Sequence, residues 1–320
     1  MSDLTGQTIE QYEVRQRLLG RPESDLYLGH DPRTDTAVFL EIAHATAAED
    51  ADFAARFRRR MEIVAQLQHP AIAPVLHVGQ AAGQRPFAAI EHRPGHFLAA
   101  HLPGWHDSGS HREPQTALSF VRQLAAPLAV AHPAGIFHHD LRPANVYLQA
   151  DDTPWFVDLG VPIAPIPQNL ETLRTTKQLD YASPEQLQGQ ALSGRSNVYS
   201  LGVLLYELLA GHRPRLPLSD WDIFDRQALP LEESLEDARG GLRPETYRVA
   251  KHCLWQKDWS RYNTVQEMIA ALDTALAAQQ TPPARPLVPP QTQPHFRLYV
   301  ILTAVLLLIA VAVVAFLLLR

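Results

Sequence analysis

Cysteine and lysine are both scarce in this sequence of 320 residues. Cys253 is the single cysteine, so no disulfide framework within the chain is available, and such cysteine usage is typical of a reducing compartment. The only lysines are Lys177, Lys251 and Lys257, which leaves the first 176 residues with none. The formal net charge is −6, so there is no basic excess, and we expect no nucleic-acid partner. The apolar fraction of 46% is sufficient for a sizeable core.

The chain also lacks an apolar leader, since residues 1–16 are polar and mixed in charge, and this predicts no secretory signal. Residues 298–319 are different, because only Tyr299 and Thr303 interrupt their apolar character. As a helix this run would reach ~33 Å, enough to cross a hydrocarbon core of about 30 Å. A buried core helix is the alternative. We expect a single-pass C-terminal anchor in the cytoplasmic membrane, with residues 1–296 in the cytosol.

The pattern of apolar residues and breakers predicts a strand-rich first part and a helix-rich second part. Two short alternating stretches flank residues 20–24, which is typical of a hairpin, and further strands are predicted at 36–42, 75–78 and 87–90. A helix is predicted within 48–68, and helices dominate after residue 114. We therefore expect an α+β, bilobal architecture with a cleft between its lobes. The expected ranges are a lead at 1–11, lobes at about 12–91 and 92–275, a Pro-rich linker at 276–297 and the membrane helix at 298–319.

Two polar motifs follow short apolar stretches near the middle of the chain. Residues 138–145 contain Asp140 and Asn145, and Asp158 opens the sequence Asp-Leu-Gly at 158–160. One carboxylate base together with an Asn and Asp pair suits phosphoryl transfer, in which oxygen ligands hold magnesium. Each motif taken singly is also compatible with an ordinary turn.

The ordered set of motifs resembles bacterial Hanks-type serine/threonine protein kinases over roughly residues 12–275. The resemblance implies that Asp140 is the catalytic base, that Asn145 and Asp158 hold magnesium on ATP, and that Glu185 pairs with Arg261. The Pro-rich linker and terminal apolar run also resemble membrane-anchored members of this family. The matching segments are 18–27 for the glycine-rich loop, 69–70, 140–145, 158–160, 184–185, 195–202 and Arg261.

Several positions depart from the family pattern where phosphate would bind. Gly20 is the only glycine left in the glycine-rich loop, and Ser24 stands where the third glycine belongs. Glu41 replaces the phosphate-binding lysine of the third strand, so attraction becomes repulsion, about 4 kcal/mol for unit charges 4 Å apart at an effective dielectric of 20. Arg21 is the nearest substitute, although a guanidinium is a poor mimic of a point charge.

The position of the C-helix glutamate falls on Arg60, which would exchange the two ends of the family's Lys–Glu pair. We therefore expect an ion pair between Glu41 and Arg60 that holds the helix against the sheet. The alternative is that Arg60 is an exposed member of the basic run 58–60.

The resemblance also places the nucleotide site. Phe39 takes a small residue's place in the roof of the adenine pocket, and Tyr147 lies in its floor; either ring could stack on adenine, but two bulky rings are expected to occlude the slot. His139 replaces the arginine that would dock a phosphothreonine, and the sequence does not decide whether Thr172, Thr175 or Thr176 is phosphorylated. The nucleotide-contacting positions are Gly20, Leu26, Phe39, Glu41, Glu91, Arg93, Tyr147 and Asp158.

We interpret the chain as a membrane-tethered pseudokinase, a scaffold or regulator that binds protein partners in a signalling complex and has impaired ATP binding. The alternative is an active or weakly active serine/threonine kinase that uses ATP and magnesium with Asp140 as base. Transfer of a different part of a nucleotide is a third possibility. ATP and magnesium are expected as cofactors only if the protein is active.

Overall fold

The computed structural model describes residues 3–100, 112–163, 180–214, 233–280, 301–309 and 311. The chain divides into two units, Met1–Gln280 and Thr281–Arg320, and each is described by itself. Thr172, Thr175 and Thr176 lie outside the described residues, as do most positions of the predicted linker and membrane helix.

The first lobe of Met1–Gln280 is an antiparallel sheet of six strands in the order β1-β2-β3-β4-β6-β5. Its central strand β4 is buried on both faces from Val38 to Ile42, as alternating side chains enter two different apolar clusters. The strands are β1 (Thr8–Ile9), β2 (Tyr12–Gly20), β3 (Ser24–Asp31), β4 (Thr36–Ala43), β5 (Val75–Ala81) and β6 (Arg85–Glu91).

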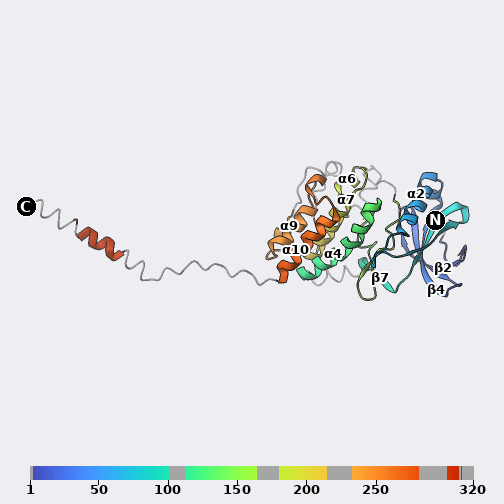
Figure 1. Ribbon diagram of the computed structural model, residues 1–320, viewed down its shortest axis with the longest axis horizontal. Helices are drawn as coiled ribbons and strands as arrows, with labels where there is room; N and C mark the ends of the chain where they lie inside the picture. The colour runs from blue at the N-terminus through green and yellow to red at the C-terminus, as the bar shows by residue number, and fades with distance from the viewer. Residues whose placement is uncertain are drawn as a thin grey trace, which may run out of the picture. The chain divides into compact units, whose positions relative to one another are not determined.

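Helix α2 (Ala51–Val64) packs against this sheet with Phe53, Phe57 and Met61 buried at helical spacing. Asp50 caps its first turn, where the carboxylate accepts a hydrogen bond from the amide of Asp52. The short helix α1 (Ala45–Ala48) precedes it. Figure 1 shows α2 beside the strands and the long helices of the second lobe grouped apart from them.

The second lobe is built around α7 (Gly194–Ala210), which is buried from Ser196 to Ala210. A helix that is apolar on all sides must be enclosed by others, and α7 packs against α4 and α9. The remaining helices are α4 (Pro114–Ala131), α6 (Pro184–Leu187), α8 (Leu235–Ala238), α9 (Pro244–Cys253) and α10 (Val265–Gln280), with 3-10 turns at Ala82–Gln84, Leu98–Ala100, His132–Ala134 and Asp258–Ser260.

A small antiparallel sheet carries part of the cleft. Its strands are β7 (Gly95–Phe97), β8 (Tyr147–Gln149) and β9 (Pro154–Trp155), so Tyr147 and Trp155 are paired directly across it. A parallel bridge between Ile72 and Phe156 joins the segment after α2 to the approach to Asp158. The two predicted motifs are thereby brought to the junction of the lobes.

The structure differs from the predicted boundaries at both ends of Met1–Gln280. Within the predicted lead, Thr8–Ile9 forms strand β1, and Leu4 and Ile9 are buried. At the other end, α10 continues to Gln280, past the predicted linker start at 276, because Ala277 to Gln280 are compatible with a helix and the first proline is Pro282. Residues 8–9 of the predicted lead are therefore part of the sheet, and α10 extends beyond residue 276.

In Thr281–Arg320, residues 301–309 are helical, and the large apolar side chains among them are exposed, as Leu307 (71%) and Leu308 (69%) illustrate. Among the described residues, no helix reaches the length and apolar character needed for a membrane span.

Candidate functional site

The turn between β2 and β3 delivers one basic side chain into the cleft. The amide of Arg21 donates to the carbonyl of Ser24 at 2.9 Å, which closes a tight turn around Pro22 and Glu23. His44, at the end of β4, fixes the tip of this turn through hydrogen bonds to Pro22 and Glu23. With its backbone held in this way, Arg21 projects inward, and its side chain is only 2% exposed.

The Arg21 guanidinium bridges the two lobes. Its Nε lies 3.2 Å from Oε1 of Glu41 on β4, and its Nη1 lies 3.1 Å from Oδ2 of Asp158 in the second lobe. Nη1 also donates to Oδ1 of Asn145. The third nitrogen, Nη2, is buried with no hydrogen-bond partner in the described part of the chain. One cation therefore engages the residue at the expected lysine position and both expected magnesium ligands.

Ser24 completes the polar environment of Glu41. Its hydroxyl donates to Oε1 of Glu41, which is fully buried. Ser24 therefore stabilises a buried carboxylate, whereas a glycine at this position would offer no side-chain donor.

The electrostatics of this cluster follow from burial and from an excess of carboxylates. Burial raises the pKa of Glu41 and outweighs the opposite effects of Arg21 and Ser24. Burial alone would also raise the pKa of Asp158, but His138 and Arg21 outweigh it and hold that pKa below its usual value. For Arg21, burial favours the neutral form, yet Glu41, Asp158 and Asp140 together raise its pKa. Arg21 therefore remains a cation in the closed cleft.

The loop that carries Asp140 is held by a network of its own. Asn145 Nδ2 donates to the backbone oxygen of Asp140 at 2.8 Å and to its Oδ2 at 2.7 Å, and Arg142 Nε donates to the same Oδ2 at 2.8 Å. His138 Nε2 donates to Oδ1 of Asp158 at 3.0 Å. Asn197, on α7, braces the loop through both backbone groups of His138. The structure thus brings Asp140, Asn145 and Asp158 together.

The predicted ion pair between Glu41 and Arg60 is not formed. Arg60 instead donates to the carbonyls of Phe137 at 2.8 Å, Gly160 at 3.2 Å and Leu159 at 3.4 Å. Its long side chain reaches the second lobe, while Arg21 and Ser24 donate to the carboxylate of Glu41. The alternative of an exposed Arg60 is also wrong, because the side chain is half-buried and bonded to these carbonyls. This burial lowers the pKa of Arg60 to about 10. Arg60 therefore fastens α2 to the segment around Asp158.

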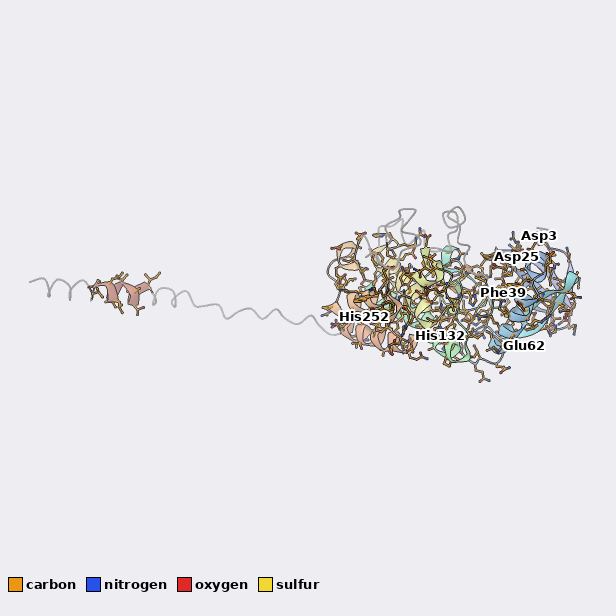
Figure 2. The ribbon with its side chains drawn as sticks, turned by 90° about the horizontal axis from the view of Figure 1, so that it is seen from above. Asp3, Asp25, Phe39, Glu62, His132 and His252 are labelled. Atoms are coloured by element: carbon orange, nitrogen blue, oxygen red, sulfur yellow. The ribbon has the colours of Figure 1, made fainter. Side chains whose placement is uncertain are left out.

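Aromatic side chains fill the predicted adenine slot. Phe39, which Figure 2 places in the strand-rich lobe, is fully buried, with its ring centroid 5.2 Å from that of Tyr147 and 4.7 Å from that of His92. The Tyr147 hydroxyl donates to the backbone carbonyl of Arg93 at 2.9 Å. The Arg93 guanidinium in turn lies 4.8 Å from the ring centroid of Trp155. Leu26 is also fully buried in this cluster.

The hinge uses its polar groups internally as well. The amide of Glu91 donates to the carbonyl of Pro74 at 2.9 Å, and the side chain of Glu91 pairs with Arg93 at 2.7 Å. Gly20 ends β2 opposite Asp25, which is paired with Arg17 at 2.6 Å. These residues at predicted nucleotide positions therefore direct polar contacts to other residues of the chain.

These observations test whether the residues fit magnesium ATP. A buried guanidinium contacts both expected metal ligands, and packed rings occupy the expected base site. In this arrangement the cleft does not fit the magnesium complex of ATP.

Two further positions are defined by the structure. Glu185 and Arg261 form a bidentate ion pair at 2.8 and 3.0 Å, as the resemblance implies. His139, where an arginine would dock a phosphothreonine, is half-buried, and desolvation together with the charge of Arg60 lowers its pKa to about 3. A neutral imidazole in this position offers no positive charge to a phosphate.

Sequence reasoning missed the contacts of Arg21 with Asn145 and Asp158. A signal was present, because Glu41 and Asp158 both belong to buried segments and no lysine precedes Lys177. Two buried carboxylates require a cation, and Arg21 lies at the hairpin tip nearest to them.

We predict that a double-mutant cycle will separate the two arginines. Glu41→Gln combined with Arg21→Gln should show a coupling of about 1–3 kcal/mol in the free energy of unfolding by urea, because the two side chains share one ion pair. Glu41→Gln combined with Arg60→Gln should be additive within about 0.5 kcal/mol. Additive effects for Arg21, or strong coupling for Arg60, would contradict these contacts.

We also predict an acid-dependent loss of stability at His139. Its folded pKa is lower than its unfolded pKa, so the stability is fully present above about pH 6.5 and is lost as the pH falls towards the folded value. This group alone should contribute a slope of up to about 1.4 kcal/mol per pH unit. Urea unfolding between pH 7 and pH 4.5 should show a shallower slope for His139→Gln than for the wild type. Equal slopes would be evidence against a neutral imidazole with a lowered pKa.

Comparison with known proteins agrees with this architecture. Residues 25–270 match the family described as protein kinase domain. The chain is 30% identical over 284 residues to the serine/threonine-protein kinase PknB of Mycobacterium leprae and over 287 residues to PknB of Mycobacterium tuberculosis, covering 87% of this chain and 45% of each relative. It therefore spans a little less than half the length of these relatives.

Among solved structures, the PknI kinase domain of Mycobacterium tuberculosis superimposes with a TM-score of 0.66 at 24% identity, covering 86% of this chain and 100% of that one. At this identity the likeness concerns the fold, with its strand-rich and helical lobes. The family match covers most of the chain, from β3 to α10. The chain belongs to the protein kinase domain family.

Proposed function

We propose that this protein is a serine/threonine-protein-kinase-like signalling module with impaired ATP binding, which acts as a scaffold or regulator for protein partners. The observation that carries the proposal is the position of Arg21 between Glu41, Asn145 and Asp158. To admit a triphosphate with magnesium, this guanidinium would have to leave, and the carboxylates of Glu41 and Asp158 would lose their common cation. Each such break in a buried pair costs about 3–5 kcal/mol.

The packed adenine slot supports the same proposal. A base could enter only if Phe39 and Tyr147 moved apart, and the Tyr147 hydroxyl would give up its bond to the carbonyl of Arg93. Both rings are almost fully buried, so their displacement would expose apolar surface. The phosphate and base regions therefore oppose nucleotide binding by separate physical means.

An active serine/threonine kinase is the second candidate, and the comparisons favour it. The relatives that match are named serine/threonine-protein kinases, and Asp140, Asn145 and Asp158 are all present in one cleft. In this reading Arg21 would swing from Glu41 to the phosphates and supply the charge that the missing lysine would have given. Asp140 would then act as the base for a protein hydroxyl, and ATP with magnesium would be the cofactors.

Titration with ATP and magnesium should separate the two candidates. We expect the melting temperature of the full chain to change by less than about 1 °C at millimolar ATP and magnesium, because a ligand stabilises only in proportion to its occupancy. Arg122→Ala is a suitable control for nonspecific effects, since this side chain on α4 pairs with Asp273 on α10 and is exposed to solvent. Clear stabilisation of the wild type by ATP, together with phosphate incorporation into a protein acceptor that Asp140→Asn abolishes, would establish the kinase instead.

We further propose that the protein is anchored in the cytoplasmic membrane by residues 298–319, with the kinase-like domain in the cytosol. The support is the apolar run itself and the exposure of large apolar side chains such as Leu307 and Leu308 within the helical residues 301–309. Such side chains require an apolar environment of bilayer dimensions or a protein partner.

Removal of residues 298–320 should therefore transfer the protein from the membrane fraction to the supernatant. The measurement is sedimentation of cell membranes, followed by an alkaline carbonate wash that retains integral proteins. The full chain should resist the wash, whereas the shortened chain should already be in the supernatant before it. If the shortened chain remained in the pellet after the wash, another segment would be the anchor.

A further inference from the structure

The Arg21 guanidinium has a geometric role that goes beyond blocking a ligand. It contacts Glu41 in the first lobe and Asn145 and Asp158 in the second, over sequence separations of 20, 124 and 137 residues. All of these contacts are buried, with side-chain exposures of 2% for Arg21, 0% for Glu41 and 4% for Asp158. A positive charge in this position draws oxygen atoms from both lobes towards one point.

The acceptors around Arg21 are also of one chemical kind. Each is a carboxylate or amide oxygen, and such oxygens are the ligands preferred by hard divalent cations. Carboxylates make up most of this surrounding, since Arg21 contacts Glu41 and Asp158, and Asp140 bonds to Asn145 in the same cluster. The neighbouring cation Arg142 is engaged with Asp140 instead. This is an environment built for a cation, and a guanidinium occupies it.

We propose that Arg21 is a built-in replacement for a divalent metal ion, a tethered cation that holds the lobes closed and keeps metal out of the cleft. The inference rests on the proposed function, because it requires that the cleft is not used for magnesium ATP in the wild type. It adds that the same oxygens form a latent site for Mg²⁺ or Mn²⁺ that opens when the guanidinium is removed. Arg21 is a positioning residue in this account, because it acts by arranging Glu41, Asn145 and Asp158.

The fit of a guanidinium to this place is incomplete. Its Nη2 is buried, and no hydrogen-bond partner for it occurs among the described residues. A buried donor without an acceptor opposes burial, and a metal ion would carry no such surplus donor. The covalent tether offsets this disadvantage. Because the turn from Arg21 to Ser24 already holds the charge in the cleft, no free ion has to be taken up from solution.

The test is metal binding without nucleotide, measured on the full chain by the electron paramagnetic resonance signal of free Mn²⁺. The wild type should leave this signal unchanged, whereas Arg21→Ala should bind one Mn²⁺ at least about tenfold more tightly, because a repelling charge has been removed. Arg21→Lys keeps a cation and should restore the wild-type behaviour. Asp158→Asn added to Arg21→Ala should abolish the new binding.

Arg17→Ala is the matched control. Arg17 lies on the same hairpin and pairs with Asp25, but its side chain is 46% exposed, and its partner lies outside the cluster around Arg21. This variant should bind Mn²⁺ no better than the wild type. Equal gains in Arg17→Ala and Arg21→Ala would show a general effect of lost positive charge, which would overturn the proposal.

The wild type provides a test that does not depend on the folding of any variant. Its melting temperature should be the same in 10 mM MgCl₂ and in NaCl of equal ionic strength. Specific stabilisation by Mg²⁺, or Mn²⁺ binding that Asp158→Asn removes, would overturn the proposal, as would a folded Arg21→Ala that binds no Mn²⁺. ATP binding to the wild type without metal would instead contradict the proposed function and leave the tethered cation in place.

Discussion

The closed cleft depends on one buried cation shared by carboxylates from two lobes. Glu41 and Asp158 would each be costly to bury alone, and a single guanidinium serves both. Because Arg21 belongs to the hairpin of the first lobe, the pairing also fixes that hairpin against the second lobe. Arg60 adds a second fastening from α2 to the carbonyls around Asp158. Side chains of the chain itself therefore link the two lobes through Arg21 and Arg60.

In this arrangement, three departures from the kinase pattern belong to a single change. Glu41 in place of lysine leaves a buried negative charge, Arg21 supplies the matching positive charge, and Ser24 donates to the same carboxylate. None of these side chains would be well placed without the other two. Taken position by position, the altered strand and the altered glycine-rich loop are two departures from the family pattern. The contacts instead indicate a single substituted network, next to an adenine slot that Phe39 fills from the same face of β4.

Much of the fold could be predicted from the sequence, because the helices and strands depend on local patterns of residues. The hairpin around Gly20, the strand that carries Phe39 and Glu41, and the helix within residues 48–68 follow from alternation, helical spacing and breakers. Strand β1 was missed, since two residues are too few for a periodic signal. The bidentate contact of Glu185 with Arg261 spans 76 residues, and only the family resemblance could suggest it.

Side-chain partners within the cleft were less predictable, and Arg60 shows why. Its place on α2 could be predicted from the sequence, but its long flexible side chain has several acceptors within reach. Which acceptor it bonds to depends on whether another donor side chain lies nearer to that acceptor. Arg21 reached Glu41 from the adjacent hairpin, so Arg60 was left to the carbonyls of Phe137 and Gly160. Positions aligned with a family identify which residues share a region. They do not determine which of two like charges pairs with a common partner.

The same reasoning decides which residues are informative about function. Asp140 and Asn145 bond to each other, and Asn145 also accepts from Arg21, so both have structural roles whether or not phosphate is transferred. Their presence therefore agrees equally well with an enzyme and with a scaffold. Arg21 and Glu41 are different, because a buried pair between them has no use in holding a triphosphate while it is closed. The substituted positions, rather than the retained ones, therefore distinguish the two functions. The free energy needed to open the Arg21 contacts determines the equilibrium between the closed and the open state of the cleft.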